Sequence, residues 1–159
     1  MARKPRNYID NVCYHIVLRG NQKQFTFHND EDFEKFLTIL RKYKLQYKNK
    51  IYAYCAMDNH FHLLLNPFNA KSFSGFMQAV NMSYAQYYNY KYKKSGHLWQ
   101  DRFKSYVVTK DSYLYNCVNY IEYNPVRARI VAKPEDYEWS SYRARNGIEK
   151  DLLLDEIVF

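Results

Sequence analysis

The spacing of apolar residues along this chain switches between two periods, and the order of those periods restricts the possible folds more than any other feature. Residues 12–19 alternate between apolar and polar positions, which predicts a half-buried strand. Residues 51–65 predict two more strands joined by a turn at Asp58-Asn59, and residues 103–109 predict a fourth. Between these strands the apolar residues recur at helical spacing.

Three segments have the spacing of an amphipathic helix. The first follows a cap at Asn29 or Asp30, and the second ends near Lys93. The third runs from about residue 111 to 124, where Pro125 limits it. The first two helices place these residues on one face: Phe33, Phe36, Leu37, Leu40 and Lys44 in the first, and Phe73, Phe76, Met77, Val80, Tyr84 and Tyr87 in the second.

This order of elements predicts an α+β protein. Strand, helix, strand, strand, helix, strand and helix match a ferredoxin-like, RRM-like split βαβ antiparallel sheet with helices on one face and one added C-terminal helix. Such a sheet leaves its other face free, and nucleic-acid-binding modules often use that face. Because the chain has only four glycines, four prolines and no linker-like stretch, we expect residues 1–147 to form a single domain.

Residues 148–159 form an apolar C-terminal tail whose role the sequence leaves open. The tail contains Leu152, Leu153, Leu154, Ile157, Val158 and Phe159. It docks on the domain, contacts a second subunit, or is the start of a longer tail.

Composition favours a nucleic-acid partner. The 159 residues carry a net charge of +8 and include 18 tyrosines and 10 phenylalanines. Lys and Arg bind phosphates while aromatic rings stack on unpaired bases, although an aromatic core beneath a basic surface would give the same composition. No apolar run reaches the roughly 18 residues that cross a bilayer, and the N-terminus lacks the apolar stretch of a secretory signal. We therefore expect a soluble, cytoplasmic protein with no membrane partner.

The tightest chemical feature is the sequence His60-Phe61-His62. Because side chains alternate along a strand, His60 and His62 point to one face of the sheet and Phe61 to the other. Neutral imidazole is a common metal ligand, so the pair could supply half of a metal site. Equally, both could be ordinary polar residues on an exposed strand. His15 could lie on the same sheet and is kept as a weak candidate for a supporting role.

The third helix could add a further ligand beside the two histidines. At about 100° per residue, Tyr120 and Asn124 lie roughly 40° apart on one flank of the core-facing stripe. Tyr115 and Asn119 have the same spacing, but they project from the opposite flank and partly away from the core. Tyr123 points nearly opposite the core, so helix geometry favours Tyr120. The stripe itself consists of Leu114, Cys117, Val118 and Ile121.

Together these motifs resemble the HUH single-tyrosine transposases, which serve the smallest insertion sequences, and above all their REP-associated tyrosine transposase branch. The matching segments are YHIVLRGN at 14–21, MDNHFHLLL at 57–65, GHLWQDRFKS at 96–105, YIEYNPVRA at 120–128 and YEWSSY at 137–142. They occur in the order of the family over roughly residues 8–145. The chain departs from the family at Arg129, where a glycine is common.

The resemblance implies a DNA transposase and endonuclease that cleaves and rejoins single-stranded, hairpin-flanked DNA through a 5′-phosphotyrosine intermediate. By position, Tyr120 would be the nucleophile, and His60, His62 and Asn124 would hold a divalent metal, Mg²⁺ or Mn²⁺. Two imidazoles suit Mn²⁺ better than Mg²⁺, so we expect Mn²⁺ to support cleavage at least as well. No general base stands out in the sequence.

The expected partner is single-stranded or hairpin DNA. Candidate DNA-binding residues near the motifs are Arg102, Lys104, Arg19, Arg127 and Phe103. The resemblance allows a homodimer, as in simple insertion sequences, or a monomer, as in the REP-associated branch. Two other functions remain open: a non-catalytic module that binds single-stranded nucleic acid, and a domesticated enzyme that acts on genomic palindromic repeats.

Overall fold

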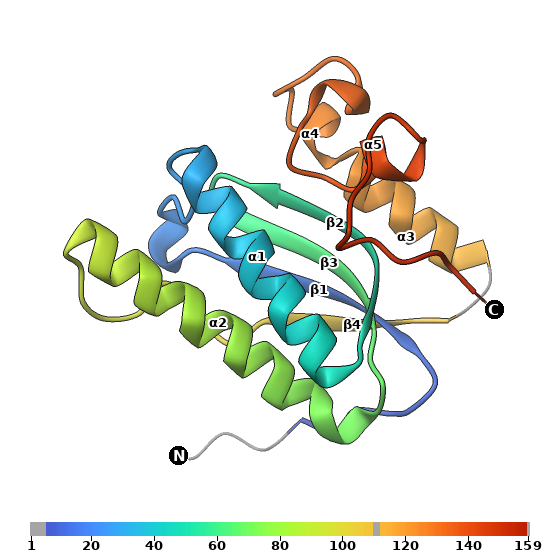
Figure 1. Cartoon of the computed structure of the whole chain (residues 1–159), viewed down its shortest axis with the longest axis horizontal. Coiled ribbons are helices and arrows are strands. Elements are labelled where there is room, and N and C mark those ends of the chain that lie inside the picture. Colours follow the sequence, from blue (N-terminus) through green and yellow to red (C-terminus); the bar gives the residue numbers. More distant parts are fainter. Residues whose placement is uncertain (1–5, 110–111, 159) are drawn as a thin grey trace.

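The computed structural model describes residues 6–109 and 112–158. Its strands β1 (Cys13–Arg19), β2 (Lys50–Met57), β3 (His60–Asn66) and β4 (Lys104–Val108) form an antiparallel sheet in the order β2-β3-β1-β4 (Figure 1). The helices are α1 (Asp30–Tyr47), α2 (Ala70–Tyr92), α3 (Ser112–Glu122), α4 (Asn124–Arg127) and α5 (Tyr142–Arg145). Two 3-10 turns, η1 (Asn21–Lys23) and η2 (Pro134–Asp136), lie in the connections. This topology confirms the predicted ferredoxin-like α+β fold.

Side-chain caps determine where α1 and α2 begin. Asn29 precedes α1, and its side chain accepts a hydrogen bond from the backbone N–H of Asp32. Of the two predicted cap residues, Asn29 and Asp30, the cap is therefore Asn29. Asn69 caps α2 in the same way. Both helices end at a lysine in the left-handed conformation, Lys48 and Lys93. No helix in the described part of the chain is both long and apolar enough to cross a membrane.

α1 and α2 lie side by side over one face of the sheet and enclose the main core (Figure 1). The strands contribute residues such as Ile16, Phe61 and Leu63, which are fully buried against both helices. The predicted faces of the two helices are confirmed, except that Leu37 and Tyr87 are only half-buried at the edges of their stripes. This side of the sheet is therefore the structural side of the molecule.

The opposite face of the sheet is only partly open, because α3 covers its apolar half. Leu114, Val118 and Ile121 are buried there against β2, β3 and the ends of β1 and β4, and Cys117 is half-buried, as the predicted stripe requires. The residues beneath α3 include Cys13, Tyr52, Cys55, Met57 and Leu64, which are all buried. The expectation of a free face therefore holds only for the remaining, polar half.

α3 ends two residues earlier than predicted. The helix was expected to reach Asn124, but it stops at Glu122, and Tyr123 (φ −91°, ψ 3°) separates it from α4. Pro125 explains the early end, since it has no N–H to donate to the carbonyl of Ile121. Asn124 consequently begins α4, with Pro125 next to it. The predicted start at residue 111 lies outside the described residues.

The C-terminal segment docks on the domain. Leu153 is buried in the same core as α1 and α2. The Lys44 ammonium group donates a hydrogen bond of 2.9 Å to the Leu153 carbonyl and pairs with Asp155 at 2.7 Å. Asp155 also bonds to the backbone of Ile51 at the start of β2. Of the three alternatives for this segment, docking is the one that the structure shows.

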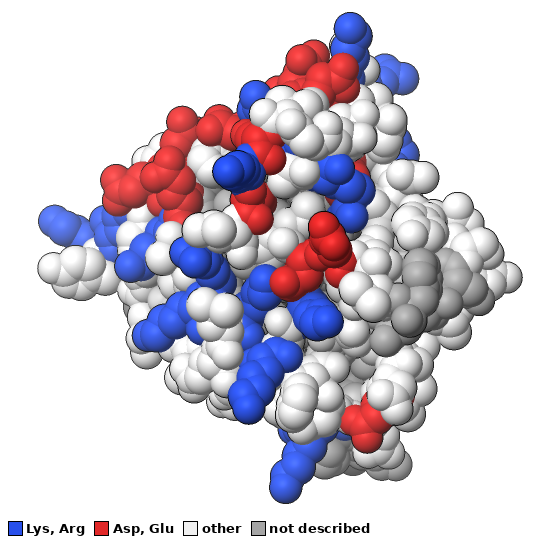
Figure 2. Space-filling model, turned by 45° about the vertical axis from the view of Figure 1, so that its right-hand side comes forward, with Lys and Arg blue, Asp and Glu red and all other residues white. Residues whose placement is uncertain are grey.

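Charge is unevenly distributed on the surface. On the face shown in Figure 2, Lys and Arg side chains gather in one band and Asp and Glu side chains gather in another. The sequence of α1 is divided in the same sense, although Asp32 and Lys44 are buried: Asp30, Glu31 and Asp32 occupy its first turn and Lys44 its last. Acidic residues at the start of a helix and basic ones at its end complement the helix dipole.

Candidate active site on the polar half of the sheet

His60 and His62 lie side by side on the sheet face that α3 leaves open. Both belong to β3, where His62 is paired with Val17 of β1 and His60 with Arg19. Phe61 points to the other face and packs on Phe36 in the main core, with 4.7 Å between ring centroids. His62 is buried and His60 half-buried. The alternation of faces inferred from the sequence is therefore confirmed.

His15 joins this pair from the neighbouring strand β1. Its Nε2 atom lies 3.0 Å from Nδ1 of His62, within hydrogen-bonding distance. In the same way, Nδ1 of His60 lies 2.8 Å from Oδ1 of Asn59, the residue just before β3. Both histidines of the His-x-His motif therefore have Nδ1 occupied. The sequence offered His15 only as a weak candidate and gave no indication of the role of Asn59.

Tyr120 reaches this cluster from α3. Its ring centroid lies 5.8 Å from that of His15 and 6.0 Å from that of His62. Half of the Tyr120 side chain remains exposed, which leaves it accessible to a ligand on the open face. Tyr123, in contrast, packs edge-on against Tyr142 at 5.8 Å. Tyr120, which helix geometry favoured, therefore lies beside the histidines.

Arg127 of α4 packs directly on Tyr120. Its guanidinium carbon lies 4.1 Å from the centroid of the Tyr120 ring, and Nη2 donates a hydrogen bond to the Tyr120 carbonyl. The sequence predicted Arg127 as a DNA contact without placing it against Tyr120. Asn124 begins α4, is half-buried, and follows Tyr120 by four residues. The break after α3 thus carries Asn124 and Arg127 into a short separate helix.

Burial keeps the three histidines neutral. It lowers the pKa of His15, and together with the charge of Arg19 it lowers the pKa of His60. In His62 burial is again the main cause, and the charges of His60, His15, Arg19 and Arg127 add to it, lowering the pKa to about 3. Neutral imidazole is the form that binds metal ions. The donor chemistry of the two histidines therefore fits a divalent cation.

Within the described residues, no group of three or more His, Cys, Asp or Glu side chains is arranged to hold a metal ion. The ligand set expected from the sequence differs from such a group, since its third member is the amide oxygen of Asn124. A ligand set of two imidazoles and one amide oxygen leaves the remaining coordination positions to water or to a phosphate oxygen, as in open catalytic metal sites.

A buried ion pair fixes the end of α3 to the sheet. Glu122 is 2% exposed and accepts hydrogen bonds from Ser141 Oγ at 2.7 Å and from Arg145 Nε at 2.8 Å. Arg145 also donates to the carbonyl of Tyr52 in β2, and Ser141 bonds to the backbone of Tyr54. Tyr120 and Asn124 flank Glu122 in the sequence. This anchoring was missed at the sequence level, because it joins segments about twenty residues apart.

Two of the predicted DNA-binding residues lie on the same face as the histidines. Arg19 at the end of β1 and Lys104 at the start of β4 are both exposed, and Lys104 is paired with Val17, the neighbour of His62. Tyr106 of β4 is also exposed, and its ring lies 6.1 Å from that of His15. A basic and aromatic strip therefore borders the candidate site.

Arg102 and Phe103 lie differently. Arg102, which precedes β4, lines a hollow beside α2, and the ring of Phe103 packs against Phe73 of α2 at 5.5 Å. Arg6 stacks on Phe103, with its guanidinium carbon 4.9 Å from the ring centroid, and donates a hydrogen bond to the Phe103 carbonyl. Phe103 is half-buried as a result, whereas Arg102 is exposed.

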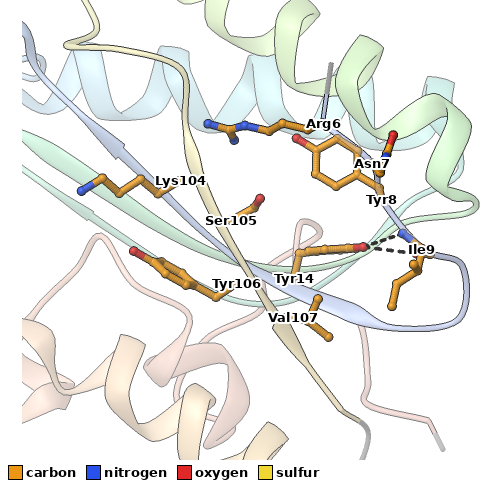
Figure 3. A pocket seen from close by; sticks show the side chains of 9 residues that line it. All are labelled: Arg6, Asn7, Tyr8, Ile9, Tyr14, Lys104, Ser105, Tyr106 and Val107. Atoms are coloured by element: carbon orange, nitrogen blue, oxygen red, sulfur yellow. Dashed lines mark hydrogen bonds between the residues drawn. The ribbon is translucent and has the colours of Figure 1, made fainter. Parts of the chain in front are cut away.

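The free edge of β4 forms a shallow hollow of about 520 Å³ with the N-terminal segment (Figure 3). Lys104 and Tyr106 extend to one side of the strand in this view, and Arg6 and Tyr8 lie on the other. Tyr14 forms part of the floor, and its hydroxyl accepts a hydrogen bond from the backbone N–H of Ile9 at 2.8 Å. The hollow thus continues the basic and aromatic strip away from the histidines.

An antiparallel ferredoxin-like sheet with a His-x-His pair on one face, and with a tyrosine presented to that pair by an added helix, is the arrangement that the resemblance to the HUH single-tyrosine transposases predicts. The family profile described as "Transposase IS200 like" matches residues 8–124 of this chain. The chain belongs to the IS200-like transposase family.

The chain is similar to individual proteins of the REP-associated branch and to a further transposase. A Haemophilus influenzae protein assigned as a REP-associated tyrosine transposase is 27% identical over 138 residues, which cover 80% of this chain and 76% of the relative. The solved structure of a REP-associated tyrosine transposase bound to a REP hairpin has a TM-score of 0.76, 16% identity and full coverage of both chains. A protein from Deinococcus radiodurans assigned as a transposase has a TM-score of 0.53 at 20% identity, covering 85% of this chain and 97% of that one.

Proposed function

We propose that this transposase cleaves and rejoins single-stranded, hairpin-flanked DNA, with Tyr120 as the nucleophile and a divalent metal held by His60, His62 and Asn124. One observation carries the proposal: the centroid of the exposed Tyr120 ring lies 6.0 Å from that of His62, and Arg127 stacks on the Tyr120 ring. The structural relative solved with a REP hairpin supports hairpin DNA as the partner.

The proposed reaction is a reversible transfer of a phosphodiester. The Tyr120 hydroxyl gives up its proton to solvent as its oxygen attacks the scissile phosphorus, the bond from phosphorus to the 3′ oxygen breaks, and the 3′ oxygen takes up a proton in return and leaves as a hydroxyl group. The phosphate then joins Tyr120 to the 5′ end of the released strand. A 3′-hydroxyl rejoins the DNA by the reverse attack, so no nucleotide cofactor is needed.

The residues around Tyr120 would hold the metal, balance charge and bind the DNA backbone. When bound, a divalent cation would neutralise charge that develops on the scissile phosphate. The Arg127 guanidinium, which stacks on the Tyr120 ring, would balance charge on the phosphate and on the phenolic oxygen. Arg19 and Lys104 border the same face and would hold the DNA backbone. Arg102 and Phe103 would contact DNA only where it passes the α2 side of β4.

A single chain brings the proposed nucleophile to the two histidines. His60, His62 and Tyr120 lie together within one copy, so no second subunit is needed to supply the tyrosine. We infer that the active form is a monomer, as the resemblance to the REP-associated branch also suggests. A homodimer, the alternative expected from simple insertion sequences, would not be needed to supply the nucleophile.

The test is the formation of a covalent adduct. Labelled single-stranded DNA that flanks a hairpin is incubated with the protein and Mn²⁺, and an SDS-resistant complex is measured. Tyr120→Phe should abolish the complex, whereas Tyr115→Phe and Tyr123→Phe should preserve it, because those rings serve as matched exposed tyrosines on or beside α3. Mn²⁺ should support the reaction at least as well as Mg²⁺.

The alternative functions predict different results in the same assay. A non-catalytic module would bind the DNA and give no adduct with the wild-type protein under any divalent cation. An adduct that survives Tyr120→Phe would contradict the assignment of the nucleophile. A domesticated enzyme would form the same adduct but would prefer palindromic repeats scattered through the genome over the ends of a mobile element.

A further inference from the structure

The Nδ1 atoms of both proposed metal-binding histidines are occupied by other side chains. Nδ1 of His60 is bonded to Asn59 at 2.8 Å, and Nδ1 of His62 to His15 at 3.0 Å. We propose that Asn59 and His15 are positioning residues, which set the tautomer and orientation of His60 and His62 so that both present Nε2 to the cation. This inference rests on the metal site of the proposed function.

The hydrogen bond to Asn59 determines where the proton of His60 resides. A neutral imidazole carries one N–H, and its other nitrogen is a bare acceptor. Because the Asn59 atom in this bond is the carbonyl oxygen Oδ1, which only accepts, His60 must place its proton on Nδ1. Nε2 of His60 then has the free lone pair that a metal ion requires.

The contact between His15 and His62 allows two arrangements, of which only one leaves Nε2 of His62 free for a metal ion. If His62 donates from Nδ1, then Nε2 of His15 accepts, and His15 carries its own proton on Nδ1. The reverse arrangement would put the proton of His62 on Nε2 and block its lone pair. A partner that fixes the tautomer of a ligating histidine in this way is a general feature of protein metal sites.

His15 is held firmly enough to impose this orientation. It is half-buried on β1, and its ring centroid lies 6.1 Å from that of Tyr106 and 5.8 Å from that of Tyr120. It therefore also connects the His62 ring to the proposed nucleophile. A change at His15 would alter the environment of both groups, which is why its test needs a measurement independent of DNA cleavage.

Asn59 is fixed through the backbone of its turn. The backbone carbonyl of Asn59 accepts a hydrogen bond of 2.9 Å from the backbone N–H of Gly20. The backbone carbonyl of the preceding Asp58 accepts one of 2.8 Å from the backbone N–H of Thr26. Gly20 cannot carry a side chain here, because a Cβ atom would lie 2.2 Å from the Gln24 carbonyl oxygen. These backbone hydrogen bonds hold the turn between β2 and β3, including Asn59, against the chain segment that follows β1.

The direct test is the protonation state of the histidine rings in the metal-free protein. Long-range ¹H–¹⁵N NMR at pH 7.5 should show His60 and His62 as Nδ1–H tautomers, whereas a free imidazole prefers the Nε2–H form. In His15→Phe, which keeps a ring of similar shape but removes the acceptor, His62 should change to the Nε2–H form. In Asn59→Ala, His60 should do the same.

Metal binding gives an independent measurement. Titration with Mn²⁺, followed by EPR without DNA, should show affinity about 10- to 100-fold weaker in His15→Phe and in Asn59→Ala. Asn59→Asp and His15→Gln keep an acceptor and should recover much of the loss, which separates positioning from misfolding. His97→Phe, an exposed histidine on the loop after α2, is the matched control and should bind Mn²⁺ as the wild type does.

The outcomes distinguish this inference from the proposed function. If the wild type binds Mn²⁺ and His15→Phe and Asn59→Ala bind it within about twofold, the positioning role is wrong while the metal site stands. Nε2–H tautomers on His60 and His62 in the metal-free wild type would also overturn it. If the wild type itself binds no Mn²⁺, the proposed metal site fails, and the positioning role toward it fails with it.

Discussion

Neighbours, and not exposure, distinguish Tyr120 from the other tyrosines of this chain. Its side chain is 50% exposed, close to the 51% of Tyr115 and not far from the 39% of Tyr123. Its ring, however, lies within about 6 Å of two histidine rings and beneath the guanidinium of Arg127. Reactivity at this residue should therefore depend on groups that can be removed one at a time.

The contribution of Arg127 can be measured against a nearby arginine. Arg127→Ala should slow adduct formation at saturating DNA by about 10-fold or more, because it removes a positive charge next to the developing negative charge. Arg127→Lys should recover only part of the rate, since an ammonium group lacks the planar face that stacks on Tyr120. Single-turnover rates of adduct formation provide the measurement.

Arg129→Ala is the control for this series, because Arg129 is exposed and lies just beyond α4. It should leave the single-turnover rate close to that of the wild type. Equal rates for Arg127→Ala and Arg129→Ala would show that the stacking on Tyr120 has no catalytic consequence.

At the scale of elements, α1 and α2 are joined by a buried carboxylate remote from the proposed site. Asp32 accepts hydrogen bonds from Lys91 at 2.8 Å, Tyr87 at 2.9 Å and the backbone N–H of His28 at 2.9 Å, and also from Tyr92. Burial alone would raise the pKa of Asp32, but these hydrogen bonds outweigh it and hold the pKa below its ordinary value. The pair of helices is thus sensitive to acid.

The lowered pKa of Asp32 determines the direction of the pH dependence. Because the folded pKa is below the unfolded one, the stabilisation is complete at neutral pH and is lost as the pH falls below about 4 and through the folded pKa. Asp32→Asn should lower the free energy of unfolding at pH 7 by about 2 kcal/mol and flatten its decline in acid. Urea titrations between pH 3 and pH 7 measure both effects.

Asp30→Asn is the matched control, since Asp30 lies in the same first turn of α1 but is exposed. It should keep the full acid dependence of the wild type. If Asp32→Asn loses stability in acid as steeply as Asp30→Asn does, the acid sensitivity has another source.

At the scale of the whole molecule, the sheet separates a structural side from a chemical side. α1, α2 and Leu153 of the C-terminal segment fill the first, while α3 and the polar half of the sheet form the second. The segment after residue 147 joins the structural side through Leu153 and through Asp155, which pairs with the buried Lys44, and its Ile157 packs against the cluster beneath α3. It should therefore affect stability more than the chemistry at Tyr120.

Two adjacent leucines test the docking of this segment. Leu153→Ala should lower the free energy of unfolding by about 2–5 kcal/mol, because Leu153 is 3% exposed and leaves a cavity. Leu152→Ala should have little effect, because Leu152 is 72% exposed. Chemical denaturation of both variants provides the comparison, and similar losses from the two changes would argue against docking.

The features that were predictable from sequence are those set by local periodicity. The alternation around Phe61 placed His60 and His62 together, and helical spacing favoured Tyr120, because both depend only on neighbouring residues. The placement of His15 beside His62 depends on β1 pairing with β3, which joins residues 47 positions apart. The same holds for Glu122 and Arg145, whose contact depends on how the chain returns to β2 after α4.

Two features of the fold differ from what the sequence predicted: how much of the second sheet face is covered, and where α3 ends. A helix on the second sheet face could be expected, but its coverage of only half of that face follows from which strand residues are apolar once the register is fixed. The sequence identified Pro125 as the limit of α3, but its missing N–H ends the helix at Glu122, two residues earlier than predicted.

The most direct test of the central claim is to identify the tyrosine that becomes linked to DNA. The wild-type adduct, formed with Mn²⁺ and hairpin-flanked single-stranded DNA, would be digested with trypsin and nuclease and analysed by tandem mass spectrometry. The tryptic peptide of residues 111–127 contains Tyr113, Tyr115, Tyr120 and Tyr123, so fragment ions distinguish the candidates within one peptide. We predict a 5′-phosphonucleotide on Tyr120. A nucleotide on any of the other three, or no linked peptide from an active preparation, would contradict the proposed site.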